Sequence, residues 1–205
     1  MIKAVLFDYG GVMSDGGRGV EITERIAANL DVSKERALDL LDVGWTLYAN
    51  GTISEDEFWS QLESAYGQPV PVEKRNIWNS WEVMRPKPEM VKFVHDLKAR
   101  QLQVGLLSNV IPYTMNQIRE HCVYDNFDFT ILSAEVGYGK PDPEIYQLAL
   151  DKLPGIRPEE IIFIDDQERF LVPARTLGIH TVAAVDPTQI IAETESLIER
   201  LANEA

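Results

Sequence analysis

The chain has 205 residues, with 19 basic and 33 acidic side chains and a formal net charge of −14. Its 45% hydrophobic and 25% charged residues are typical of soluble globular proteins and exclude a disordered or collagen-like chain. The negative charge argues against nucleic acid or an anionic membrane surface as a partner, because both attract clusters of Lys and Arg.

The single cysteine and the start of the chain bear on the compartment. Cys122 has no second cysteine with which to form a disulfide, and the apolar run at 4–7 is too short for a signal peptide. No stretch approaches the ~20 apolar residues that a membrane-spanning helix needs. We therefore expect a cytoplasmic protein; its oligomeric state is unknown from the sequence.

The first predicted element is a short buried strand at 4–7, and a long helical segment follows it. Residues 14–85 contain no convincing strand, but Ser33 precedes an apolar helical pattern and Ser54 begins a capping box. All four tryptophans lie in this segment, and we expect them to pack in its interior or against the rest of the molecule. Prolines at 86 and 88 mark its end. Residues 14–85 are therefore predicted to be a helical insert, and 1–13 with 86–205 to form an α/β core.

Beyond residue 86, apolar runs alternate with amphipathic helical patterns. Strands are predicted at 104–107 and 161–164, with weaker candidates at 129–132 and 179–183. Apolar residues at helical spacing predict helices near 90–97, 145–153 and 190–201. This alternation predicts an α/β fold with a doubly wound parallel sheet.

Polar residues follow each of the three strong strands. Asp8 follows the first strand, Ser108 and Asn109 end the second, and Asp165 and Asp166 end the third. Because ligands bind at the carboxyl ends of strands in open α/β sheets, we expect these side chains to converge in one crevice. Carboxylates crowded together repel one another unless a cation is present, and their oxygens suit Mg²⁺.

Lys140 is a further candidate, in the loop Gly139-Lys140-Pro141-Asp142-Pro143 before a predicted helix. A carboxylate nucleophile, a Mg²⁺ ion, a hydroxyl donor and an ammonium group are the components of aspartyl-phosphate chemistry. The candidate residues could supply the carboxylate, the hydroxyl and the ammonium, and could bind the ion.

The order of these residues resembles the four motifs of the haloacid dehalogenase-like (HAD) hydrolase superfamily. The matching runs are Phe7-Asp8-Tyr9-Gly10-Gly11-Val12, Leu106-Leu107-Ser108-Asn109, Gly139-Lys140-Pro141-Asp142-Pro143 and Ile164-Asp165-Asp166. A helical insert after the first strand is similar to the subfamily with a C1-type cap. The resemblance implies a HAD-like, Rossmann-type core and a Mg²⁺-dependent phosphatase of a small phosphorylated metabolite, for example a sugar phosphate.

The resemblance also implies a role for each residue that contacts substrate. Asp8 would attack phosphorus and become an aspartyl-phosphate. Ser108 and Asn109 would hold the phosphoryl oxygens, and Lys140 would neutralise the charge of the nucleophile and the phosphoryl group.

The metal site is implied in the same way. Mg²⁺ would be held by the carboxylates of Asp8, Asp165 and Asp166 and by the carbonyl oxygen of Gly10. In this assignment Asp166 is the main ligand, and Asp165 is a second or water-mediated one.

Two positions depart from the family pattern. Gly10 stands where most phosphatases of the family carry an aspartate that acts as general acid and base, although relatives resembling sugar-1-phosphate phosphatases also have glycine there. Phe170 stands where the family usually has Asn or Asp. Tyr9 and Arg18 are further candidates for substrate contact.

Two other functions remain open at this stage. One is a 2-haloacid dehalogenase, which needs no metal; the Asp165-Asp166 pair and Gly10 argue against it. The other is a catalytically quiet member that binds a ligand or a partner, which the two departures at Gly10 and Phe170 favour.

Overall fold

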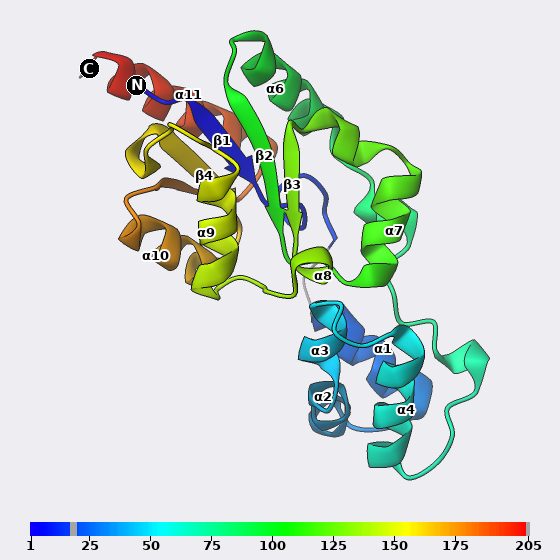
Figure 1. Cartoon of the computed structure of the whole chain (residues 1–205). Helices are drawn as coiled ribbons and strands as arrows, with labels where there is room; N and C mark the ends of the chain where they lie inside the picture. The colour runs from blue at the N-terminus through cyan, green and yellow to red at the C-terminus, as the bar shows by residue number, and fades with distance from the viewer. Residues whose placement is uncertain (17–19, 204–205) are drawn as a thin grey trace.

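Figure 1 shows a computed structural model of the chain, which describes residues 1–16 and 20–203. At its centre is a five-stranded parallel sheet in the order β3-β2-β1-β4-β5. The strands are β1 (Ala4–Phe7), β2 (Gln103–Ser108), β3 (Phe129–Leu132), β4 (Ile161–Asp165) and β5 (His180–Ala183). The predicted doubly wound α/β fold is confirmed, including its two weaker strands.

Helices cover both faces of the sheet, because successive residues of a strand point to opposite sides. Val5 and Phe7 pack with α6 (Pro88–Ala99), α7 (Pro112–Glu120) and α11 (Pro187–Asn203). Ala4 and Leu6 pack with α9 (Pro143–Asp151) and α10 (Glu168–Thr176) on the other face. The strand order reverses beside β1, which places the topological switch point there. The remaining core elements are α8 (Ser133–Val136) and the 3-10 turns η2 (Val123–Asn126) and η3 (Pro158–Glu160).

In its described part, the segment between β1 and α6 forms only helices and loops. They are α1 (Val20–Leu30), α2 (Lys34–Asp42), α3 (Trp45–Ala49), α4 (Glu55–Tyr66), the 3-10 turn η1 (Val72–Lys74) and α5 (Trp81–Met84). Ser33 caps α2 by accepting a hydrogen bond from the Arg36 amide (3.2 Å), and Ser54 forms the predicted capping box with Glu57 at the start of α4. Residues 20–80 are called the cap below.

The cap has an apolar interior of its own, rich in aromatic rings. Trp59 and Trp78 are buried in it, and Trp45 packs at its edge. Trp81, in α5, instead packs against the apolar cluster of the core and stacks on His121. The tryptophans therefore lie where the sequence predicts them, whereas the exact domain boundaries at 14 and 85 stay a prediction.

The cap meets the core where α3 lies against α8 (Figure 1). The Ser133 hydroxyl of α8 lies 3.1 Å from the carbonyl oxygen of Ala49, to which it can donate, and accepts a hydrogen bond from the Val110 amide (2.9 Å). One side chain thus joins the cap to the loop that follows β2. In the described ranges, none of the helices has both the length and the apolar character needed to span a bilayer.

Candidate active site

The carboxyl ends of three neighbouring strands bring predicted site residues together. Asp8 follows β1, Ser108 ends β2 and Asp165 ends β4, and β1 lies between the other two strands. The three residues are 6%, 2% and 0% exposed, respectively. Their meeting point is the switch point of the sheet, where α/β proteins of this type bind ligands.

Lys140 reaches the same point from the loop between α8 and α9. Its Nζ lies 2.9 Å from Asp8 Oδ1 and 2.6 Å from Asp165 Oδ2, and its side chain is fully buried. Asn109 holds the backbone of this loop: its Nδ2 donates to the Lys140 carbonyl oxygen (2.8 Å), and its Oδ1 accepts from the Lys140 amide (2.7 Å). The observed contacts of Asn109 thus position Lys140, and its contact with a phosphoryl oxygen stays a prediction.

Burial and neighbouring charges set the ionisation of this cluster. Burial alone would lower the pKa of Lys140, but the charges of Asp8 and Asp165 outweigh it and raise that pKa. Burial, and then the charge of Asp8, raise the pKa of Asp165 to about 7, against the opposing effect of Lys140. The Lys140 ammonium therefore stays charged at neutral pH. A further cation nearby would favour the ionised form of Asp165.

Asp166 completes a group of three carboxylates that could hold a metal ion. Asp8, Asp165 and Asp166 each offer an oxygen, and these oxygens all lie within 4.8 Å of one another. When ionised, three carboxylates against one ammonium leave two negative charges, which a divalent cation would balance. The donors are hard oxygens, the kind that Mg²⁺ prefers, so the residues present fit this ion.

Gly11 makes room for Asp166. A Cβ atom on Gly11 would lie 2.5 Å from both Cγ and Oδ2 of Asp166, and the φ of +76° is in the left-handed region that favours glycine. Gly10, next to it, lines the cavity described below and is not among the described glycines with positive φ. Its predicted carbonyl contact with a metal is untested.

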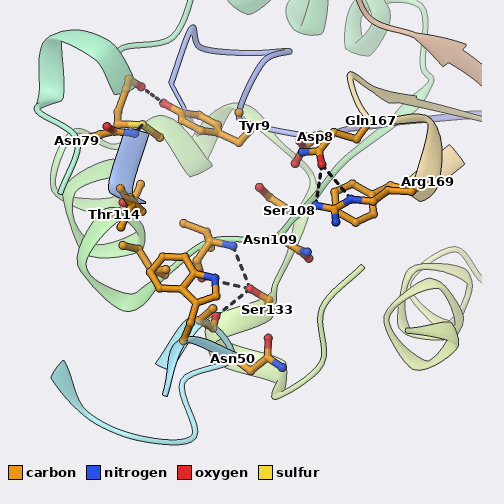
Figure 2. Close-up of a pocket in the computed structure, with 18 residues that line it drawn as sticks. Asp8, Tyr9, Asn50, Asn79, Ser108, Asn109, Thr114, Ser133, Gln167 and Arg169 are labelled. Carbon is orange, nitrogen blue, oxygen red and sulfur yellow. Dashed lines mark hydrogen bonds between the residues drawn. The ribbon is translucent and has the colours of Figure 1, made fainter. Parts of the chain in front are cut away.

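A cavity of about 240 Å³ lies beside Asp8, between the core and the cap (Figure 2). The core contributes polar residues, among them Ser108, Asn109 and Arg169. The cap and α5 contribute Ile22, Trp45, Ala49, Asn50, Asn79 and Met84, none of which carries a charge. Of the described residues that line the cavity, Asp8 is the only carboxylate.

The two aromatic residues that the sequence singled out also line this cavity. The hydroxyl of Tyr9 donates to the Met84 carbonyl oxygen, and burial raises the pKa of Tyr9 far above its usual range. Tyr9 is therefore tied to the segment that leads out of the cap and is a poor proton donor. Phe170 is buried in the first turn of α10. Arg18 lies outside the described residues.

Other cavity residues were not identified from the sequence. Asn79 and Thr114 are both buried, and Figure 2 shows them away from Asp8 across the view. Neither belongs to a motif, and their spacing from the catalytic candidates carries no signal. Asn79 reaches the cavity only through the packing of the cap on the core, whereas Thr114 lies in the core helix α7 that follows β2.

The chain is similar to several known proteins. A family model described as haloacid dehalogenase-like hydrolase matches residues 2–174. The chain is 29% identical to acyl-CoA dehydrogenase family member 10 of Mus musculus over 96% of its own length, but it spans only 19% of that protein. It is 27% identical to the sesquiterpene phosphatase astK of Aspergillus oryzae, with 96% of each chain covered.

Two further matches come from Bacteroides thetaiotaomicron. A D-ribitol-5-phosphate phosphatase is 27% identical, over 88% of this chain and 91% of that protein. A HAD family enzyme solved in complex with magnesium and inorganic phosphate is 29% identical, with a TM-score of 0.70 over 91% of this chain and 97% of that chain. Since the family model covers most of the sequence, the chain belongs to the haloacid dehalogenase-like hydrolases.

Proposed function

We propose that this protein is a Mg²⁺-dependent phosphatase of a small phosphorylated metabolite. The single observation that carries the proposal is the cluster at the strand ends, where the Asp8 carboxylate lies 2.9 Å from the buried Lys140 ammonium and within 4.8 Å of two more carboxylates. Relatives named as phosphatases and a similar structure that holds magnesium and phosphate support it.

In the proposed reaction, an oxygen of Asp8 attacks phosphorus and the bond from phosphorus to the ester oxygen breaks. The ester oxygen leaves as an alkoxide that takes a proton from water, and the phosphoryl group stays on Asp8 as an acyl phosphate. Water then attacks the same phosphorus, which releases inorganic phosphate and restores the Asp8 carboxylate. Both steps transfer one phosphoryl group, so no oxidant or further co-reactant is needed.

The residues around Asp8 would lower the barrier by electrostatics. Lys140 would offset negative charge on the nucleophile and the phosphoryl oxygens, and the Ser108 hydroxyl would donate to one of those oxygens. Asp8, Asp165 and Asp166 would hold Mg²⁺, with the Gly10 carbonyl as a further ligand. When bound, Mg²⁺ supplies positive charge to the reacting phosphoryl group.

The cavity suggests the class of alcohol that leaves. Its volume of about 240 Å³ suits a small molecule, and the described residues contributed by the cap and α5 are apolar or carry neutral amides. Asn79 is 8% exposed, and its Oδ1 accepts no hydrogen bond from any residue that the structure describes. We therefore favour the phosphate ester of a small, uncharged, hydroxylated alcohol, such as a sugar or a polyol, whose hydroxyl could pair with this amide.

A substrate screen tests the proposal. Purified protein is incubated with sugar phosphates, polyol phosphates, phosphorylated carboxylic acids and p-nitrophenyl phosphate, each with Mg²⁺ and with EDTA, and phosphate release is measured. The expected result is Mg²⁺-dependent release, and among esters whose leaving alcohols have similar pKa values it should be fastest with uncharged hydroxylated alcohols. Chloride release from chloroacetate in EDTA would show a dehalogenase instead, and no turnover of any compound would favour a catalytically quiet member.

A further inference from the structure

Phe170 replaces a residue that the family pattern expects to be polar, and its surroundings suggest why an aromatic ring can stand there. It lies in the first turn of α10 and is 4% exposed. Its carbonyl oxygen accepts a hydrogen bond from the Tyr146 hydroxyl (2.7 Å), which ties the start of α10 to α9. The backbone of Phe170 is therefore anchored, and its buried side chain forms part of the cavity wall.

The ring of Phe170 lies next to the ammonium group of Lys140. Nζ is 5.1 Å from the centroid of this ring and 5.3 Å from the centroid of Phe163. Both distances are within the ~6 Å over which the negative face of an aromatic ring attracts a cation. An ammonium has three protons, of which Asp8 and Asp165 take two. The two rings thus occupy space around Nζ that the carboxylates do not.

A chain of contacts holds the Phe170 ring in place. The Arg169 guanidinium lies 4.6 Å from its centroid, and Nε and Nη2 of Arg169 donate to Gln167 Oε1 (3.1 and 2.8 Å). The amide of Gln167 in turn donates to Asp165 Oδ1 (2.8 Å). A continuous series of contacts therefore leads from Lys140 through Phe170, Arg169, Gln167 and Asp165 back to Lys140.

A ring and an amide would act differently on Lys140. An Asn or Asp side chain at position 170 would offer an oxygen acceptor, which could draw the ammonium away from Asp8 and Asp165. An aromatic face attracts the cation without offering it a directed acceptor. The two hydrogen bonds of Nζ can then stay on the two carboxylates.

We propose that Phe170 is a positioning residue, whose ring face holds the Lys140 ammonium between Asp8 and Asp165 in the geometry that phosphoryl transfer needs. The inference rests on the proposed phosphatase function. In this proposal the aromatic ring supports Lys140 in place of the polar side chain that the family pattern expects. Phe170 is then no sign of a lost activity.

Graded fluorination of the ring tests the proposal directly. Phenylalanine analogues with one, two and three ring fluorines are incorporated at position 170, because fluorine weakens the negative face of the ring while its shape changes little. The same series at Phe127 is the matched control, because this ring is buried and no cation of the described residues lies over its face. Turnover of p-nitrophenyl phosphate with saturating Mg²⁺ is measured, together with KM and the thermal unfolding midpoint.

We expect kcat to fall stepwise along the Phe170 series, by about 3- to 30-fold in total, while KM changes little and the Phe127 series stays flat. Phe170→Tyr keeps a ring face and should retain most of kcat, whereas Phe170→Leu should lose as much as the most fluorinated ring. A constant kcat along the Phe170 series in an active enzyme would overturn this proposal alone. An unmodified protein that hydrolyses no phosphate ester would overturn the proposed function and this proposal with it.

Discussion

The two sides of the cavity differ in how their polar groups are satisfied. On the core side, Lys140 contacts two carboxylates, and both ends of the Asn109 amide pair with the Lys140 backbone. On the cap side, the lining residues that the structure describes are uncharged, and none of the described residues donates a hydrogen bond to the Asn79 oxygen. A preorganised, charged side suits a reaction, and an open, neutral side suits the choice of a substrate. We infer that the core fixes the chemistry and the cap selects the alcohol.

Loss of the nucleophile should give the largest effect. Asp8→Asn removes the attacking charge at nearly constant size, so kcat should fall on the order of 10³-fold or more. Thermal unfolding should show that the fold survives, because Asp8 lies at a strand end and outside the apolar clusters. Retention of more than about a tenth of the activity would be inconsistent with nucleophilic attack by Asp8.

Removal of the metal should abolish turnover, and its effect on stability should depend on pH. The pKa of Asp165 is raised to about 7 in the folded protein, whereas in the unfolded chain it is about 4. Between these two pH values the unfolded chain releases its proton first, so the metal-free fold loses stability as pH rises from about 4 to about 7. Mg²⁺ binds the ionised form and should offset that loss. Calorimetry should therefore find a larger rise in Tm on adding Mg²⁺ at pH 8 than at pH 6. An equal rise at both values would contradict the Asp165 assignment.

Because position 10 is a glycine and carries no carboxylate, the enzyme should be sensitive to its leaving group. A general acid contributes about 10²–10⁴-fold when the leaving oxygen needs a proton. Gly10 cannot supply one, and Asp8 is the only carboxylate among the described lining residues. Aryl and anomeric sugar phosphates should therefore react much faster than alkyl phosphates of similar size. This difference is measured as the slope of log kcat/KM against the pKa of the alcohol.

Gly10→Asp is the converse experiment. It should speed the slow alkyl esters and flatten the slope, and Gly10 is not among the described residues with the positive φ that would resist the change. A flat slope in the unmodified protein would mean that another group delivers the proton, and a protonating residue between Ser14 and Arg85 would then be sought by mutation.

Gly11→Ala should weaken the metal site. The added Cβ would meet Asp166 at 2.5 Å. We expect about 10- to 100-fold weaker Mg²⁺ binding by titration calorimetry, the size of effect seen when the support of a metal ligand is disturbed. Gly155→Ala is the matched control, since Gly155 has a similar φ of +80° and nothing lies within 4 Å of its Cβ position. Equal Mg²⁺ affinities in the two variants would argue against Asp166 as a ligand.

Changes in the cap should have the smallest effect and alter selectivity. Asn79→Leu keeps the size of the side chain but removes its polar atoms, so kcat/KM for hydroxylated esters should fall about 5- to 10-fold. The value for p-nitrophenyl phosphate should stay within about twofold. Asn116→Leu, at an exposed position of α7, is the control. A similar loss for both substrates would indicate that Asn79 stabilises the fold and does not contact the substrate hydroxyl.

The core side of the cavity could be predicted from the sequence because its catalytic candidates lie at the ends of strands. An apolar run that stops at Asp8 or at Asp165 marks both the strand and the position of the side chain at its tip, and parallel pairing brings the tips together. The role of Asn109 was harder to predict, because capping, substrate binding and support of a neighbouring loop all use an amide after a strand.

The cap side of the cavity could not be predicted in this way. Asn79 reaches the cavity only through the packing of the cap on the core, and that packing depends on many weak apolar contacts without a fixed spacing in the chain. The contact between Phe170 and Lys140 is of the same kind, since 30 positions separate the two residues. Sequence patterns report local structure, and these contacts are tertiary.

Trapping the covalent intermediate tests the central claim most directly. The protein is mixed with Mg²⁺ and a fast substrate, quenched in acid within the first turnover and digested, and the peptides are weighed by mass spectrometry. The predicted result is a peptide containing Asp8 that is heavier by one phosphoryl group, with fragment ions that place the group on Asp8. An unmodified Asp8 peptide during rapid phosphate release, or a phosphoryl group on another residue, would contradict the assignment of Asp8 as the nucleophile.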